Sequence, residues 1–206
     1  TVSTQRGCPY TCRWCSTAVY GQSYRRRSAQ KVAAELRNLK EAYDPDQVWF
    51  VDDVFTVSHK WLAAFHEEVL KQDAVIPFEC ITRAERLNDE VLDMLKESGC
   101  FRDMTITAKE KGIETGTFIM LGYPGETEED IFLTLDHLTK ADPDLFTITV
   151  AYPIKGTGLY DDIKDRITKQ PDWFSSTDRD IDFIRTYSRP YYDYAVRWVV
   201  NKVQLH

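Results

Sequence analysis

The chain has 206 residues, a formal net charge of -7 at pH 7 and a hydrophobic share of 43%. This composition fits a globular protein with a sizeable core, and the acidic balance gives no general attraction to nucleic acid. No run of 18 apolar residues occurs and the first residues do not resemble a secretory leader, so we expect no membrane span and no export signal. Five cysteines are too sparse for a disulfide-stapled scaffold, which favours a reducing, cytoplasmic location.

The chain begins at Thr1 without a methionine, and residues 1–5 are long enough only for the end of a first strand. We therefore expect it to be a fragment of a longer protein.

Three cysteines follow almost at once, Cys8, Cys12 and Cys15, with the spacing Cys-x3-Cys-x2-Cys. Gly7 and Pro9 flank the first of them and predict a loop that turns its thiols inward. Thiolates are the usual ligands of iron–sulfur clusters, and three of them leave one iron of a four-iron cluster open. Two alternatives remain. The cysteines could form the buried stripe of a helix, because they are spaced i, i+4 and i+7, or they could hold structural zinc, which normally takes four ligands in two pairs.

Strand and helix patterns then alternate along the chain. Strands are predicted at residues 47–51, 77–82, 116–121 and 145–152, and helices at 28–43, 58–72, 88–99 and 127–141. Ser28, Ser58 and Asn88 are predicted N-caps, and Thr127 with Asp130 fits a capping box. Residues 47–51 form an apolar run typical of a strand buried on both faces. The alternation predicts a parallel sheet with helices outside it.

The alternation fails between Gly99 and Gly116, where no strand fits and residues 103–111 have a helix-like pattern. Either the protein lacks a strand–helix segment here, or residues are missing between Arg102 and Asp103. We favour the second interpretation, because the loss of a central strand would leave the backbone groups of its neighbours without partners.

Chemically active residues follow several of the predicted strands. Because ligands bind at the carboxyl ends of parallel strands, we expect these residues to share one site. The candidates are the cysteine loop, Asp52 and Asp53, Arg83, residues 122–126 and residues 151–153. Each has an ordinary alternative when taken alone, since paired aspartates often cap helices and Gly-Tyr-Pro-Gly is a plausible turn.

The cysteine stretch, with Trp14 just before the last cysteine, resembles the signature of the radical S-adenosylmethionine (SAM) superfamily. The resemblance implies a [4Fe–4S] cluster on Cys8, Cys12 and Cys15, with SAM chelating the open iron. It also implies a partial (β/α)6 TIM-like barrel, here residues 1–158, followed by an irregular and helical C-terminal extension at residues 159–206. The Tyr- and Trp-containing tail could cover the mouth of such a barrel.

Further residues acquire roles through the same resemblance. Asp52 and Asp53 stand where the family usually has a Gly-Gly-Glu-like motif for the SAM amino group, and this departure resembles the cobalamin-linked branch. Arg83 would pair with the SAM carboxylate or a ribose hydroxyl, and Trp14 would lie against adenine. The remaining expected cofactor contacts are Gly122, Pro124, Gly125, Glu126 and Tyr152.

The expected activity is reductive cleavage of SAM that initiates radical chemistry, as an oxidoreductase or a methyltransferase. The substrate would be a small molecule or a tetrapyrrole-like compound, the electron donor a flavodoxin or ferredoxin, and cobalamin a cofactor of the full-length protein. Methylthiotransferase-like sulfur insertion is a second enzymatic possibility. A zinc-binding interaction module without catalysis is the alternative from another class.

The remaining reactive side chains suggest no second centre. Cys80 and Cys100 are predicted to be small buried hydrophobes, and the four histidines form no metal-ligand pattern. The run Arg25-Arg26-Arg27 favours a solvated basic turn over contact with an anionic substrate.

Overall fold

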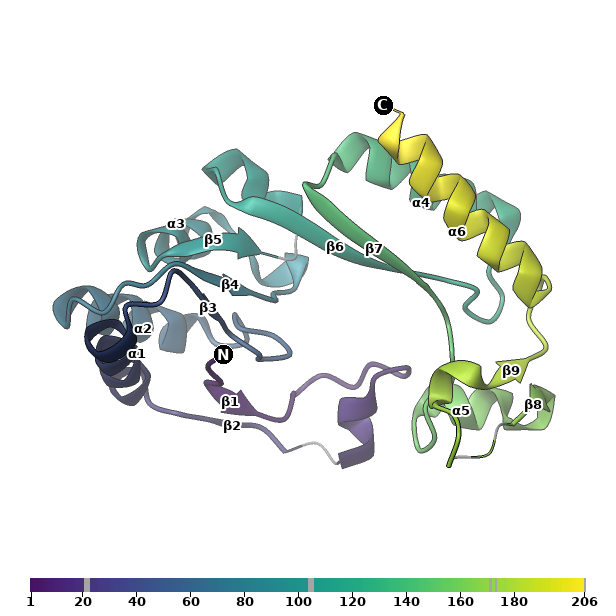
Figure 1. Ribbon diagram of the computed structural model, residues 1–206, viewed down its shortest axis with the longest axis horizontal. Helices are drawn as coiled ribbons and strands as arrows, with labels where there is room; N and C mark the ends of the chain where they lie inside the picture. The colour runs from purple at the N-terminus through teal and green to yellow at the C-terminus, as the bar shows by residue number, and fades with distance from the viewer. Residues whose placement is uncertain (21–22, 104–105, 171, 173, 206) are drawn as a thin grey trace. The chain divides into compact units, whose positions relative to one another are not determined.

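The structure, a computed structural model, describes residues 1–20, 23–103, 106–170, 172 and 174–205 (Figure 1). The chain forms two compact units. The first comprises Thr1–Cys8, Ser23–Thr117 and Pro143–Leu145, and the second Pro9–Gln22, Phe118–Asp142 and Phe146–His206. The expected extension after residue 158 belongs to the second unit together with earlier segments, and a domain boundary at that residue stays a prediction.

One sheet has the strand order β3-β4-β5-β6-β7. Its strands are β3 (Val48–Trp49), β4 (Phe78–Cys80), β5 (Cys100–Asp103), β6 (Glu114–Leu121) and β7 (Leu145–Val150). The pairings β3–β4, β4–β5 and β5–β6 are parallel, and Val2 forms a parallel bridge with Phe50. The predicted α/β class with a parallel sheet is confirmed.

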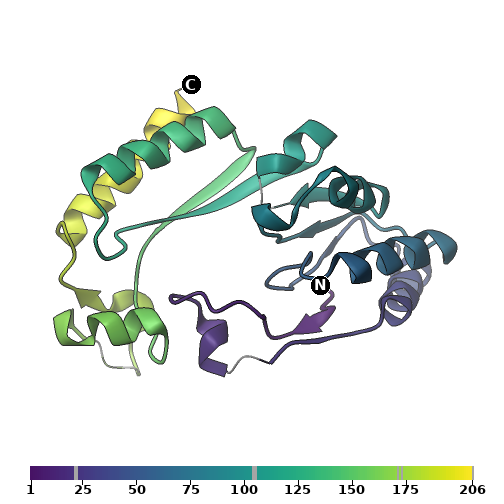
Figure 2. The same cartoon turned by 180° about the vertical axis from the view of Figure 1, so that it is seen from behind.

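Three helices of the first unit begin at their predicted caps: α1 (Ala29–Tyr43), α2 (His59–Lys71) and α3 (Asp89–Glu97). The side chains of Ser28, Ser58 and Asn88 each accept a hydrogen bond from a backbone N–H of the first turn. Helix α1 packs on α2 and α2 on α3, so the three form a layer on one face of β3, β4 and β5 (Figure 2).

The core of the first unit is aromatic. Phe50, Phe55, Phe65 and Phe78 are fully buried, and the ring centroids of Phe50 lie 4.7 Å from Phe55 and 4.9 Å from Phe78. The expectation that residues 47–51 are buried on both faces is wrong, because Trp49 and Val51 are 45% and 43% exposed. The described helices pack on the side of this segment that carries the buried Val48 and Phe50.

The expectation that no strand lies between Gly99 and Gly116 is also wrong. Strand β5 occupies that place, parallel to β4 on one side and β6 on the other, and it runs through Arg102 and Asp103. The hydrophobic pattern of the sequence did not indicate this strand because the charged Arg102 lies in its middle. The Arg102 guanidinium pairs there with Glu79 and Glu114 on the flanking strands. The expected helix at 103–111 is a 3-10 helix, η3 (Ile106–Lys111).

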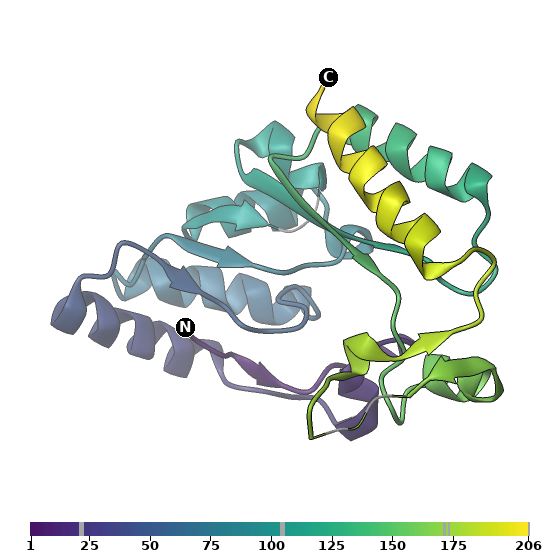
Figure 3. The ribbon, with the colours of Figure 1, turned by 45° about the vertical axis from the view of Figure 1, so that its right-hand side comes forward.

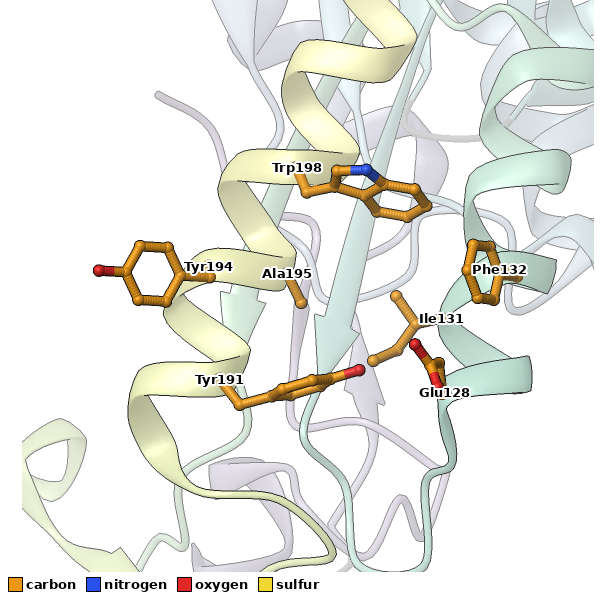
Figure 4. Close-up of a pocket in the computed structure, with 7 residues that line it drawn as sticks. All are labelled: Glu128, Ile131, Phe132, Tyr191, Tyr194, Ala195 and Trp198. Atoms are coloured by element: carbon orange, nitrogen blue, oxygen red, sulfur yellow. The ribbon is translucent and has the colours of Figure 1, made fainter.

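In the second unit, α4 (Glu128–Ala141) and α6 (Arg189–Gln204) pack together beside β7 (Figure 3). The capping box of Thr127 and Asp130 is present, and α6 is the helical part expected in the extension at residues 159–206. Side chains of both helices line a cavity of about 360 Å3 (Figure 4), which none of the predicted site residues lines.

A separate, small hydrophobic core lies in the less regular part of the chain after residue 157. It joins α5 (Gly158–Ile163) to the antiparallel pair β8 (Ile167–Lys169) and β9 (Asp182–Phe183) through Leu159, Ile163 and Phe183. Short 3-10 helices complete the chain: η1 (Ser16–Tyr20), η2 (Ala84–Arg86), η4 (Lys164–Arg166) and η5 (Asp178–Asp180). Within the described residues, no helix is long and apolar enough to span a membrane.

Candidate active site

The cysteine loop has the open conformation that Gly7 and Pro9 predict. Residues 8–15 contain no helical residue, so the helical-stripe alternative is wrong. Gly7 has φ 75°, and a Cβ there would lie 1.7 Å from the carbonyl oxygen of Ser23, so only glycine fits this turn. Beyond it, the backbone N–H of Cys15 donates to the carbonyl of Cys12 over 3.1 Å and closes a short turn between these two cysteines.

The three thiols have the donor chemistry of an iron–sulfur site. Cys8 is buried, whereas Cys12 and Cys15 are half-buried, and all three lie in the described chain as thiols outside disulfides. Cys8 belongs to the first unit and the other two to the second. No set of three metal-ligating side chains is gathered within the part of the chain that the structure describes. The thiolate type, number and spacing fit a cluster with one open iron.

Within the second unit, the part of this loop between Cys12 and Cys15 is held by Arg13, which the sequence patterns did not single out. Arg13 donates from Nε to Asp162 Oδ2 over 3.0 Å and from Nη2 to the carbonyl of Gly158, while the N–H of Leu159 donates to the Arg13 carbonyl over 2.7 Å. The Arg13 guanidinium lowers the pKa of Asp162 by hydrogen bonding and charge. The start of α5 therefore positions the segment between Cys12 and Cys15.

Asp52, three residues after the end of β3, has a structural role. It is 2% exposed, and its carboxylate accepts from the backbone N–H of Thr4 over 2.8 Å, from the Thr4 hydroxyl and from the backbone N–H of Gln5. It also lies 3.9 Å from Nη2 of Arg26. These contacts fix the segment that leads into the cysteine loop and occupy the carboxylate, so they do not favour the expected role of Asp52 as a SAM ligand. Asp53 is exposed and retains that role as a prediction.

The next two strand ends also carry polar residues. The Thr82 hydroxyl donates to the Asp103 carboxylate, with Oγ1 within 2.8 Å of both oxygens, and Asp103 is fully buried. This pair follows β4 and ends β5, and it was missed because β5 itself was missed. Arg83, directly after Thr82, is half-buried and forms an ion pair with Glu85, so its guanidinium is already engaged near the strand end.

The glycine-rich turn after β6 folds back on itself. Gly122 has φ 78°, and its N–H donates to Glu126 Oε2 over 2.6 Å. Partial burial raises the pKa of Glu126, and the Gly122 N–H opposes this increase. Gly122 is buried, Pro124 half-buried and Gly125 exposed. The turn therefore presents backbone at its tip, as expected for close approach of a ligand.

Two aromatic residues of the predicted site have accessible surface. Trp14 is 46% exposed, and Tyr152, which follows β7, is half-buried with the Arg179 guanidinium 5.6 Å from its ring centroid. Both rings can therefore contact a planar ligand. Of the predicted residues, Cys8, Asp52, Asp53 and Arg83 lie in the first unit, and Cys12, Trp14, Cys15, Gly122, Pro124, Gly125, Glu126 and Tyr152 in the second.

Comparison with known proteins identifies the part of the chain that contains the three cysteines. A family model described as the radical SAM superfamily matches residues 2–106. An uncharacterized methyltransferase of Pyrococcus horikoshii is 29% identical over 78% of this chain and 41% of its own length. The anaerobic magnesium-protoporphyrin IX monomethyl ester cyclase of Rubrivivax gelatinosus is 25% identical over 79% of this chain and 34% of its own length.

Solved structures of the radical SAM methyltransferase TsrM from Kitasatospora setae share the fold. One, with tryptophan substrate and a SAM analogue bound, superposes with a TM-score of 0.79 over 96% of this chain and 51% of that one, at 14% identity. Another, with cobalamin and a [4Fe–4S] cluster bound, has a TM-score of 0.72 over 80% of this chain and 39% of that one, at 17% identity. The present chain thus spans about half the length of these relatives or less.

Proposed function

The chain belongs to the radical SAM superfamily, and from this membership we propose that it is the catalytic part of a larger enzyme that cleaves SAM reductively. The observation that carries the proposal is the family match over residues 2–106, which contains Cys8, Cys12 and Cys15. The zinc-module alternative finds no support in the family match.

In this proposal the three cysteines would hold a [4Fe–4S] cluster, which when bound supplies the electron that cleaves SAM. Thiolate ligands need a reducing compartment, so we place the enzyme in the cytoplasm. A reduced flavodoxin or ferredoxin would be the electron donor.

The chain's own residues contribute positioning and binding. Arg13, held by Asp162 and by the backbone of Gly158 and Leu159, would keep Cys12 and Cys15 in place when ligands bind. Asp52 does the same for the approach to Cys8 by tying residues 4 and 5 to the end of β3. Positioning of this kind lowers the entropy cost of assembling a site.

Contacts to SAM would come from the strand ends. Asp53 would face the amino group, since a carboxylate and an ammonium form a charge-assisted hydrogen bond. The exposed ring of Trp14 and the backbone of residues 122–125 would take the adenine, with Tyr152 as a further aromatic contact. Arg83 already pairs with Glu85, and Glu126 already accepts from the Gly122 N–H, so we propose these two only as secondary contacts to SAM.

Among radical SAM reactions we propose methyl transfer, with cobalamin in the full-length enzyme. The support is that relatives named as methyltransferases match most of this chain, and that TsrM, which binds cobalamin and a cluster, shares its fold. Cyclisation, the activity named for the Rubrivivax relative, and sulfur insertion are the alternatives. The substrate would be a small or tetrapyrrole-like molecule.

The test is anaerobic reconstitution of the chain with iron and sulfide, reduction with dithionite in the presence of SAM, and detection of SAM cleavage products. The wild-type chain should bind iron and cleave SAM. Cys12→Ala should lose both, whereas Cys100→Ala, which removes a buried thiol outside the loop, should retain iron. Equal iron loss in both variants, or no iron in the wild type, would contradict the proposal.

A further inference from the structure

The short ribbon that precedes and follows the cysteine loop carries an arginine-lined cavity. Strands β1 (Gln5–Arg6) and β2 (Arg25–Arg26) pair antiparallel, with Gln5 opposite Arg26 and Arg6 opposite Arg25 (Figure 1). The cavity has a volume of about 480 Å3, a size typical of small-molecule sites. It is lined by Ser3, Gln5, Arg6, Arg25, Arg26 and Arg27.

Arg26 is used to hold the ribbon in place. Its Nη2 donates to the carbonyl of Phe55 over 2.7 Å, and its guanidinium lies 3.6 Å from the centroid of the Trp61 ring. The carboxylate of Asp52 lies 3.9 Å away and balances its charge. Arg26 therefore fixes the ribbon on the core of the first unit.

Arg27 is held in the same way. Its Nη1 donates to the carbonyl of Ser3 over 2.9 Å, its Nη2 forms an ion pair with Glu35, and the Trp61 indole N–H donates to its carbonyl over 2.7 Å. The ribbon is thus ordered before any ligand arrives, which reduces the entropy cost of binding.

Arg6 and Arg25 differ from these two. Both are exposed, and within the described residues neither has an ion pair or a side-chain hydrogen bond. As directly opposed residues of an antiparallel pair, their side chains share one face of the ribbon. Like charges in this position are destabilising, and the chain as a whole carries a net charge of -7, so a general demand for basic residues does not explain them.

The charges indicate which ligand fits. Asp52 and Glu35 balance Arg26 and Arg27, which leaves the two positive charges of Arg6 and Arg25. A phosphate monoester carries nearly two negative charges, and its three terminal oxygens can accept from two guanidinium forks, whereas a carboxylate has oxygens for one. We propose that this cavity binds the phosphate group of a phosphorylated small molecule, with Arg6 and Arg25 as its main ligands.

The test measures binding of phenyl phosphate and of inorganic phosphate to the whole chain by calorimetry at low salt, with acetate as the carboxylate comparison. Phenyl phosphate should bind saturably to one site, and more tightly than acetate. Arg6→Gln and Arg25→Gln should each raise its Kd about tenfold or more, the effect of losing a charge-assisted contact. Arg37→Gln is the matched control, because this exposed arginine of α1 pairs only locally, with Glu41.

Arg25→Lys keeps the charge without the fork and should weaken binding by a smaller factor than Arg25→Gln. Circular dichroism establishes that each variant is folded. Tighter binding of phenyl phosphate than of inorganic phosphate identifies an organic phosphate, equal affinity identifies the free ion, and either result supports the site. No saturable phosphate binding, equal weakening by Arg37→Gln, or binding of poly-glutamate in place of phosphate would overturn it. None of these readouts depends on the cluster or on SAM, so failure here leaves the proposed function untouched.

Discussion

Replacing Asp52 and its neighbour Asp53 by alanine separates a structural carboxylate from a ligand-binding one. Asp52→Ala would leave the buried N–H of Thr4 and that of Gln5 without acceptors and remove the carboxylate beside Arg26. Each orphaned buried donor costs ~1–3 kcal/mol. We therefore expect a loss of ~3–5 kcal/mol in the free energy of unfolding, in the range for breaking a buried charge contact.

The assay is thermal and urea unfolding of the purified chain, followed by circular dichroism, for wild type and both variants. At about 2–4 °C per kcal/mol for a chain of this size, Asp52→Ala should lower the melting temperature by ~10 °C. Asp53→Ala removes an exposed carboxylate and should change it by no more than about 2 °C, while weakening SAM binding to the reconstituted protein. If Asp52→Ala melted with the wild type, or if both variants were destabilised equally, the structural assignment of Asp52 would be refuted.

The turn after β6 provides two further predictions. Gly122→Ala places a Cβ at φ 78°, 3.2 Å from Cγ1 of Val150, and should destabilise the chain by ~1–3 kcal/mol in urea unfolding. Gly125→Ala, at φ 91°, carries similar backbone strain, but nothing lies within 4 Å of its added Cβ, so it should cost less, and equal losses would contradict the packing argument. Burial raises the pKa of Glu126 above its usual 4.5, so the folded state binds this proton more tightly than the unfolded state does. The folding stability gained in this way is fully present below pH 4.5 and is lost as the pH rises through the raised pKa. Glu126→Gln should therefore gain stability relative to wild type over that interval, measured as the urea midpoint at successive pH values, and a difference independent of pH would show that the carboxyl is not perturbed.

Local chemistry made several elements predictable from sequence. Ser28, Ser58 and Asn88 begin helices where their side chains accept from the first turn, and the Thr127–Asp130 capping box does the same for α4. These interactions lie within three residues of the cap, so they need no knowledge of the fold. The cysteine spacing likewise indicated the family correctly.

Strand β5 shows where local reasoning fails. Its sequence Cys100-Phe101-Arg102-Asp103 lacks an apolar run, because Arg102 is stabilised by glutamates that are 23 and 12 residues away in the chain. Only the register of three parallel strands brings these charges together. The Thr82–Asp103 pair was missed for the same reason.

The sequence by itself determined the cysteine triad, the alternating strands and helices and the residues that follow the strands, since each depends on residue type and short-range spacing. Tertiary structure decided what those residues do. In the folded chain the Asp52 carboxylate accepts from the backbone of Thr4 and Gln5, Arg13 donates to Asp162, and Arg6 lies opposite Arg25 on one ribbon. These outcomes join positions from 19 to 149 residues apart, and contacts at such separations depend on how the strands pair and not on any local pattern.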